Sequence, residues 1–209
     1  LRPLASYQDD NFLDLTRIKR SPANESKTTG KGQGVGAVVG HTSKSRSNPL
    51  KVTLLSLHKQ SYQLGDEIIY DVSLENISNS IAIIPWSPDQ DAVKPDENKT
   101  PPGYLVANLS LVIIDEISGE QFIAGQGLYG STVVPRSLKR IAPKQSVRIR
   151  VPGRLVFYSA DEAKRISQKL PYKVEVRARF SFLQGHSASQ VESIASTNSI
   201  FVDLKKRQV

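Results

Sequence analysis

Four carboxylates lie close together in one proline-rich stretch of the 209-residue chain. Residues 85–103 hold five prolines and the four acidic residues Asp89, Asp91, Asp96 and Glu97. Carboxylate oxygens are the ligands that Ca²⁺ prefers in proteins. The EF-hand spacing and its glycine are absent, however, so these residues are only a weak calcium candidate. A solvated acidic loop is the interpretation that we favour, and the sequence predicts no cofactor.

The residue patterns that nucleophilic or redox catalysis needs are missing from the chain. It contains no cysteine, and none of its serines lies in a G-x-S-x-G elbow. The glycines of residues 30–40 have neither a strand before them nor a helix after them, so they indicate a linker and not a dinucleotide site. We therefore expect a protein that is not an enzyme. An unrecognised active site would need His58 or His186 to meet carboxylates in a cleft.

The net charge of +8 is unevenly distributed along the chain. Residues 51–135 carry 4 basic and 11 acidic residues, a net charge of −7, whereas residues 136–179 carry 13 basic and 3 acidic residues, a net charge of +10. Either the two halves complement each other within one domain, or the basic half faces an acidic protein or lipid headgroups. Because residues 136–154 contain no aromatic side chain for stacking on bases, nucleic acid is not an expected partner. The candidate contact residues are Arg148, Arg150, Arg177 and Arg179.

The clearest structural signal is the strict alternation of apolar and polar side chains over residues 172–182. Successive side chains of a strand point to opposite faces, so this segment is predicted to be a long strand with one buried face. We expect it to be a central strand that pairs near the strand at residues 68–75. One helix is predicted at residues 159–170, because Ser159 and Glu162 form a capping box and Pro171 stops the helix.

The N-terminal residues 1–50 differ in composition from the domain predicted at residues 51–209. Within them, Phe12, Leu15 and Ile18 recur at helical spacing and predict a short amphipathic helix at about residues 9–20. Residues 21–50 are rich in glycine, serine and lysine and are predicted to be a flexible linker. A helix of about three turns is marginal alone in water. It should therefore pack on its own domain or dock on a partner through Phe12, Leu15 and Ile18.

Together these segments predict an all-β protein. The expected architecture is a Greek-key, immunoglobulin-like β-sandwich of roughly 7–9 strands, with one short inserted helix and a long, mostly irregular N-terminal arm.

Two sequence patterns resemble those of bacterial immunoglobulin-like and fibronectin-III-like domains. Tyr62-x-x-Gly65-Asp66-x-Ile68-x-Tyr70 is similar to the start of their second strand, and Pro171-Tyr172-x-Val174 is similar to their sixth strand. Over residues 51–204 the layout is similar to the bacterial intracellular proteinase-inhibitor family. The chain departs from these domains at Lys144, where many of them have glycine, and in its arm, its proline-rich loop and its helix.

The expected function follows from these observations. The chain begins at Leu1 and contains no methionine, so we expect an extracytoplasmic protein (periplasmic, cell-surface or secreted) whose signal peptide has been removed. It is predicted to be a non-enzymatic protein-interaction or structural module, an accessory subunit of a larger assembly docked through its arm. Its expected partners are proteins with an acidic surface, and a membrane surface is a further expected contact. The alternatives are a protease inhibitor that uses residues 85–103 and a carbohydrate-binding module that uses Trp86.

Overall fold

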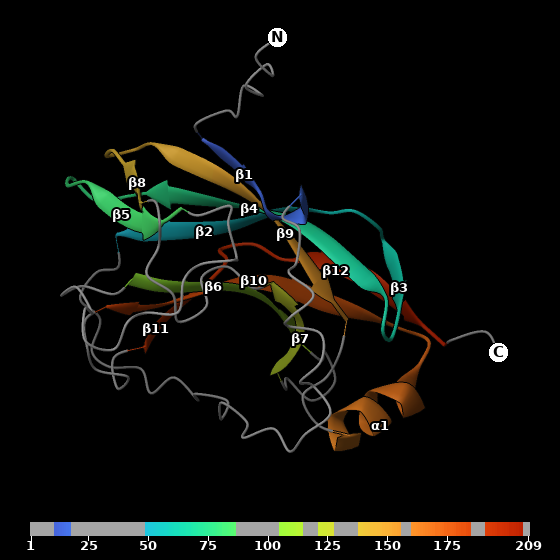
Figure 1. The fold of residues 1–209 in the computed structure, drawn as a ribbon. Coiled ribbons are helices and arrows are strands. Elements are labelled where there is room, and N and C mark those ends of the chain that lie inside the picture. The colour runs from blue at the N-terminus through green and yellow to red at the C-terminus, as the bar shows by residue number, and fades with distance from the viewer. Residues whose placement is uncertain are drawn as a thin grey trace, which may run out of the picture.

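The computed structural model shows a mostly β protein with one α-helix in its described part (Figure 1). The described residues are 11–17, 49–86, 105–114, 121–127, 138–155, 160–184 and 191–206. The first sheet has the order β1 (Phe12–Asp14), β9 (Ser146–Arg154), β4 (Glu67–Asn76) and β2 (Leu50–Leu57). The second sheet has the order β3 (Ser61–Gln63), β12 (Ile200–Lys205), β10 (Tyr172–Gln184), β6 (Leu105–Ile114) and β7 (Gln121–Gly127), and β11 (Val191–Ala195) also pairs with β10. A third, two-stranded sheet consists of β5 (Ala82–Pro85) and β8 (Leu138–Ile141).

The two larger sheets share one hydrophobic core. Alternate side chains of β4, such as Val72 and Leu74, and of β10, such as Val176 and Phe180, are almost fully buried in it. The buried hydroxyl of Tyr70 on β4 donates a hydrogen bond to the carbonyl oxygen of Leu109 on β6, 3.0 Å away, and so joins the sheets directly. The all-β prediction is confirmed. The described residues form twelve strands instead of 7–9, because short strands of three to five residues show no period in the sequence.

The long alternating segment is the central strand of the second sheet. β10 runs for 13 residues and pairs with β6 on one side and with β12 and β11 on the other. The prediction of a long central strand is confirmed, whereas its expected pairing near residues 68–75 is wrong, because β4 lies in the first sheet. Alternation reveals which face of a strand is buried, but it carries no information about which strand lies beside it.

The predicted internal helix is also present. α1 (Ala160–Lys169) ends just before Pro171, and it buries Ile166 while its exposed positions carry charged and polar side chains. In Figure 1 it lies at the opposite end of the molecule from β5 and β8. Within the described ranges, no helix has both the length and the apolar character that crossing a membrane requires.

The N-terminal segment corrects the helix predicted at residues 9–20. Its described part, residues 11–17, forms the strand β1 and a 3₁₀-helix at Leu15–Arg17. β1 pairs in parallel with β9, and Leu13 and Leu15 are only 1% and 3% exposed in the shared core. The edge of β9 offers backbone hydrogen bonds together with burial, which an isolated short helix lacks. The segment therefore belongs to the domain, and Ile18 lies outside the described residues.

We expect the substitution Leu13→Ala to lower the free energy of unfolding by about 2 kcal/mol. Leu13 is fully buried, but β1 is an edge strand, so the space it leaves can partly collapse. Urea unfolding followed by the fluorescence of Trp86, the single tryptophan, measures the change. Leu55→Ala is the matched control, since Leu55 is 45% exposed on β2. Equal losses from both substitutions would show that β1 is not docked as described.

Lys144 occupies a backbone conformation that normally favours glycine. It lies in the turn between β8 and β9 with a φ angle of 63°, and its ammonium group donates a hydrogen bond to the carbonyl oxygen of Ile77 at 2.9 Å. Alanine would keep the left-handed backbone and lose the hydrogen bond, whereas glycine would relieve the backbone. We therefore expect Lys144→Gly to be more stable than Lys144→Ala by about 1 kcal/mol. Thermal unfolding of the two variants side by side tests this order, and a more stable alanine variant would contradict it.

The connection at residues 196–198, which we call the crossing, joins the two large sheets by hydrogen bonds at a second place. Between β11 and β12, the backbone N–H of Ser196 donates to the carbonyl of Ala178 on β10 at 2.7 Å. Two residues further on, the side-chain amide of Asn198 accepts from the backbone N–H of Leu54 at 2.9 Å and donates to its carbonyl at 2.8 Å. The backbone N–H of Thr197 also donates to Val52 at 2.9 Å. The outer edge of β2 is thereby covered at Val52 and Leu54 by the connection between two strands of the other sheet.

Candidate functional site

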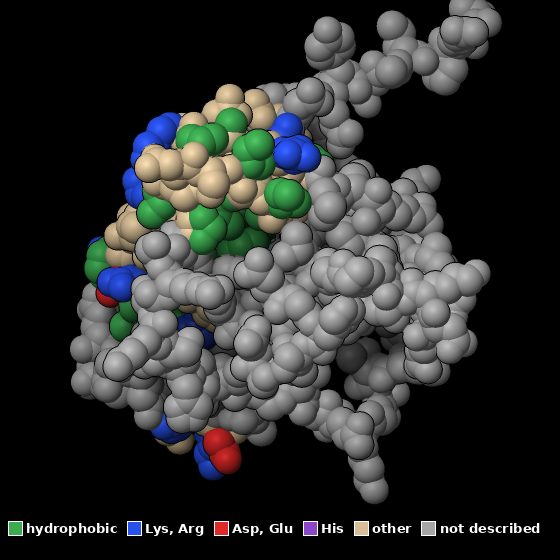
Figure 2. Space-filling model, turned by 90° about the vertical axis from the view of Figure 1, so that its left-hand side faces the viewer, with side chains coloured by type: hydrophobic (Ala, Val, Ile, Leu, Met, Phe, Trp, Pro, Cys, Tyr) green, Lys and Arg blue, Asp and Glu red, His purple; other side chains and the backbone are tan. Residues whose placement is uncertain are grey.

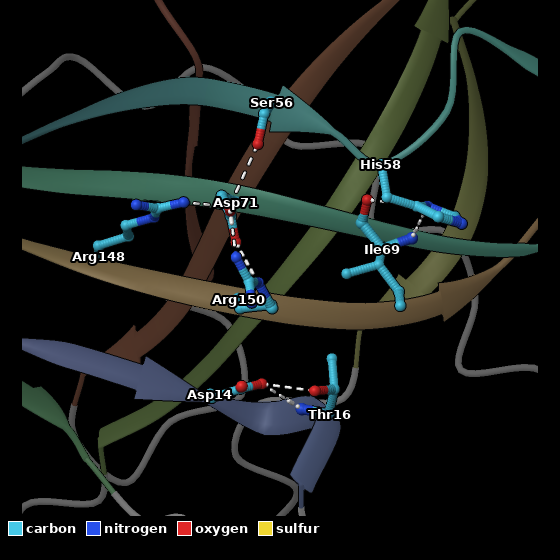
Figure 3. A network of polar contacts seen from close by, with 8 residues as sticks. All are labelled: Asp14, Thr16, Ser56, His58, Ile69, Asp71, Arg148 and Arg150. Carbon is cyan, nitrogen blue, oxygen red and sulfur yellow. Dashed lines mark hydrogen bonds and ion pairs between the residues drawn. The ribbon is translucent and has the colours of Figure 1, made fainter. Parts of the chain in front are cut away.

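A network of charged and polar side chains lies on the outer face of the first sheet (Figure 3). The carboxylate of Asp71 on β4 accepts two hydrogen bonds from the guanidinium of Arg150 on β9, at 2.9 and 3.2 Å. Arg148, two residues earlier on β9, donates to the same carboxylate, as does the hydroxyl of Ser56 on β2 at 3.2 Å. Three neighbouring strands thus contribute one charged cluster, whose register is Ser56 opposite Asp71 opposite Arg150.

Electrostatics within this cluster favour the ionised carboxylate. Asp71 is only 4% exposed, and burial alone would raise its pKa. The hydrogen bonds and positive charges of Arg150 and Arg148 outweigh that effect, so the pKa of Asp71 lies below its ordinary value of 3.8. The same hydrogen bond raises the pKa of Arg150.

Phe12 of β1 completes the cluster from the edge of the sheet. Its ring is half-buried, and the guanidinium carbons of Arg148 and Arg150 each lie 5.5 Å from the ring centroid, within the range of cation–π attraction. Three of the predicted partner-binding residues are therefore brought together, and they contact one another. Since Asp71 comes from the acidic half of the chain and both arginines from the basic half, these contacts support complementarity within the domain.

A hollow of about 370 Å³ opens beside this cluster. Thr16, Ser56, His58, Asp71 and Arg150 are among its lining residues. The Nδ1 atom of His58 accepts a hydrogen bond from the backbone N–H of Ile69 at 3.0 Å, and the backbone N–H of His58 donates to the Ile69 carbonyl at 3.0 Å. The imidazole thus extends the pairing of β2 with β4.

The hollow brings a serine, a histidine and an aspartate together, as the hypothesis of an unrecognised enzyme requires, but their contacts differ from those of a catalytic triad. In a triad the histidine links the serine hydroxyl to the carboxylate. Here the hydroxyl of Ser56 donates directly to Asp71, while Nδ1 of His58 is bonded to the backbone of Ile69 and lies 3.3 Å from the hydroxyl of Tyr62. These contacts stabilise the sheet and do not activate a nucleophile.

The other predicted basic residues lie on the second sheet. Arg177 and Arg179 are on the outer face of β10, and Arg177 forms an ion pair with Glu175 at 2.8 Å. The pKa of Glu175 is lowered, first by a hydrogen bond from Ser199 and then by Arg177. The four arginines named from the sequence therefore belong to two separate surfaces, and their role in partner binding stays a prediction.

The remaining predicted sites can be placed only in part. The calcium candidates Asp89, Asp91, Asp96 and Glu97 lie outside the described residues, as does most of the loop at 85–103. Among the residues that the structure does describe, no group of three or more histidine, aspartate or glutamate side chains could hold a metal ion. Trp86 is half-buried against the core, and the ammonium of Lys139 lies 5.9 Å from its ring centroid. This arrangement supports core packing over a sugar platform.

The structure adds one surface that the sequence did not single out, which we call the isoleucine patch. Ile77, Ile81 and Ile83 are 45%, 50% and 42% exposed at the end of the molecule formed by β5, β8 and the turn before β5. Arg140 lies directly opposite Ile83 in the β5–β8 pair. Figure 2 faces this end, and hydrophobic side chains lie among lysines and arginines in its upper part. The signal in the sequence was an apolar residue at every position from 81 to 84, too many for a short strand with one buried face.

No protein family and no curated protein sequence matches this chain. Among solved structures, the DNA glycosylase AlkC of Pseudomonas fluorescens, bound to DNA with an abasic site analog, is 12% identical with a TM-score of 0.36, over 75% of this chain and 30% of that one. The sporulation control protein Spo0M of Bacillus subtilis is 14% identical with a TM-score of 0.32, over 76% and 50%. A protein from Archaeoglobus fulgidus is 10% identical with a TM-score of 0.31, over 78% and 98%.

These likenesses carry no argument about activity or partners, because the identities and TM-scores are low. The chain spans about a third of AlkC and half of Spo0M. None of the three proteins is named as an immunoglobulin-like domain or a proteinase inhibitor, so the resemblance drawn from the sequence stays a prediction.

Proposed function

We propose that the chain is a non-enzymatic, extracytoplasmic binding module with an immunoglobulin-like Greek-key sandwich, serving as an accessory subunit of a larger protein assembly. The observation that carries this proposal is the isoleucine patch (Figure 2), since exposed apolar side chains that gather at one end of a folded domain mark interaction sites.

The polar cluster supports the non-enzymatic part of the proposal. Asp71 is held by two arginines, and His58 is bonded to backbone, so the side chains best suited to chemistry are committed to stabilising the first sheet. A general base or nucleophile needs to reach the proton or atom on which it acts. In the described hollow, the groups of those kinds already have structural partners.

In this proposal the N-terminal arm no longer has the partner-docking role that was expected from the sequence. Leu13 and Leu15 are buried in their own domain and Phe12 is covered by two arginines, so β1 anchors the arm to the sandwich. Docking on a partner is therefore assigned to the isoleucine patch.

The test is to isolate the protein from its source under native conditions and measure the mass of the particle that contains it. We expect a stable complex that is heavier than the 23.0 kDa chain and includes at least one other protein. A chain that stays monomeric in the intact source, or a purified chain that turns over a substrate, would contradict the proposal.

A further inference from the structure

The geometry points to the partner's chemistry: we infer that the isoleucine patch binds an apolar surface rimmed by carboxylates on a partner protein. This inference rests on the proposed function and adds to it the chemistry of the partner's surface.

The apolar part of the patch is held in place by a buried side chain. Asn76 is 0% exposed, and its amide nitrogen donates to the carbonyl of Ser80 at 2.7 Å and to the carbonyl of Ile141 on β8 at 2.8 Å. Its amide oxygen accepts from both the backbone N–H and the hydroxyl of Ser78, at 3.0 and 2.8 Å. These bonds fix the turn between Ile77 and Ile81 and join it to the third sheet. A surface ordered before binding loses little conformational entropy on association.

The charged side chains of the two described segments at this end are basic. The two segments that form this end, residues 76–86 and 138–145, contain three basic side chains and no acidic one. Arg140 is exposed opposite Ile83, and the ammonium of Lys144 lies beside Ile77, where it donates to the Ile77 carbonyl. An apolar centre with a polar, charged rim is the usual anatomy of a protein interface. The positive rim calls for carboxylates on the partner, since complementary charge governs specificity and the rate of association.

The shape of the patch favours a protein over a lipid surface. The three isoleucines are each about half covered by their neighbours, so each offers only part of its side chain to a partner. Trp86, the residue type that anchors proteins at the level of lipid headgroups, is half-buried here with Lys139 over its ring. A folded partner can match such a surface, whereas insertion into a bilayer needs protruding side chains.

The experiment begins with a photo-reactive residue in place of Ile81, cross-linked in the intact source so that the partner and its cross-linked segment are identified. The purified partner is then titrated with the full chain at several salt concentrations. We expect Ile83→Asp to weaken binding by about 30-fold or more. Arg140→Glu should weaken it by about 5-fold and reduce its salt dependence.

Phe201 and Lys173 provide matched controls. Phe201 is 45% exposed on β12, and the ammonium of Lys173 lies 5.3 Å from its ring centroid, so the pair is a second apolar–basic surface on a different sheet. Phe201→Asp and Lys173→Glu should change the affinity by less than about 2-fold. Circular dichroism and thermal unfolding establish that Ile83→Asp, a substitution at a half-exposed site, leaves the fold intact.

The possible outcomes are distinct. A complex that Ile83→Asp and Arg140→Glu leave unchanged overturns this inference and the docking role of the patch, while the role as an accessory subunit stands, and the absence of any complex overturns all three. Cross-links to a second copy of the chain, or to a partner segment without carboxylates, contradict the inference that the partner is an acidic protein. If the chain binds phosphatidylcholine vesicles containing phosphatidylserine and Ile83→Asp abolishes this binding, the patch binds a membrane and not a partner protein.

Discussion

Replacing Asp71 with alanine is expected to lower the free energy of unfolding by about 3 kcal/mol. The substitution leaves Arg148 and Arg150 side by side without the carboxylate that pairs with both, and it removes the acceptor of the Ser56 hydroxyl. The loss falls at the lower end of the range for buried pairs because the arginine side chains are 49% and 36% exposed and gain water in exchange. Urea unfolding with Trp86 as the fluorescent probe measures the effect.

Glu75→Gln is the matched control for this prediction. Glu75 lies on the same strand and pairs with Lys51 at 3.3 Å, but both side chains are substantially exposed. Surface pairs of this kind contribute less than about 1 kcal/mol. A loss from Asp71→Ala no larger than that from Glu75→Gln would show that the cluster does not stabilise the first sheet.

The contribution of Asp71 should also depend on pH in a defined direction. Its folded-state pKa lies below its ordinary value of 3.8, so the unfolded chain takes up the proton more readily than the folded protein. The stabilisation is therefore complete above that value and is lost as the pH falls through the lowered folded pKa. The difference in unfolding free energy between the native protein and Asp71→Ala should shrink as the pH is lowered from about 6 to about 3. Glu175 is present in both proteins, so its own lowered pKa cancels in this difference. A difference that is constant with pH would contradict the assignment.

The second large effect is expected at Asn76, where alanine should cost about 3–4 kcal/mol. The side chain is fully buried and makes four hydrogen bonds, so its removal takes one donor from each of the carbonyls of Ser80 and Ile141 and takes the acceptor from the backbone N–H of Ser78. Asn76→Asp distinguishes the contribution of side-chain size from that of the donated hydrogen bonds. Aspartate is nearly the same size as asparagine, but it places a carboxylate against those two carbonyls. We expect it to be at least as destabilising as alanine, as measured by urea unfolding.

Ser78→Ala is the control for Asn76, since it removes one partner and leaves the buried amide in place. It should cost about 1 kcal/mol. An Asn76→Asp variant that unfolds at the urea concentration of the native protein would rule out the donor role of Asn76.

Long elements whose apolar residues recur at a regular spacing could be predicted from the sequence. Short elements, and elements that depend on contacts with distant parts of the chain, could not. Residues 172–182 alternate at every position, and the capping box and proline mark both ends of α1. β1 escaped prediction because three residues are too few to show a period, and because Leu13 is buried against Ile149, its partner far along the chain. The spacing of Phe12 and Leu15 fits a helix equally well.

The candidate site shows the same division. The alternation of Val147, Arg148, Ile149 and Arg150 is typical of a strand with both arginines on its outer face, which is where β9 places them. Their partner Asp71 could not be identified, since pairing between β4 and β9 depends on strand register and topology, which leave no local mark in the sequence. The isoleucine patch was hidden for a related reason, because composition does not reveal which face of a short strand its neighbours leave uncovered.

The crossing at Ser196–Asn198 has a consequence for how the protein is made. Asn198 and the backbone of Leu54 that it binds are 144 positions apart, so this part of the β2 edge stays uncovered until residues 196–198 have been synthesised. Folds closed by such distant contacts form slowly, and uncovered strand edges pair readily with other chains. A chain that stops before residue 196 leaves the backbone groups of Val52 and Leu54 open to pairing with other chains, whereas a chain that includes residues 196–198 covers them.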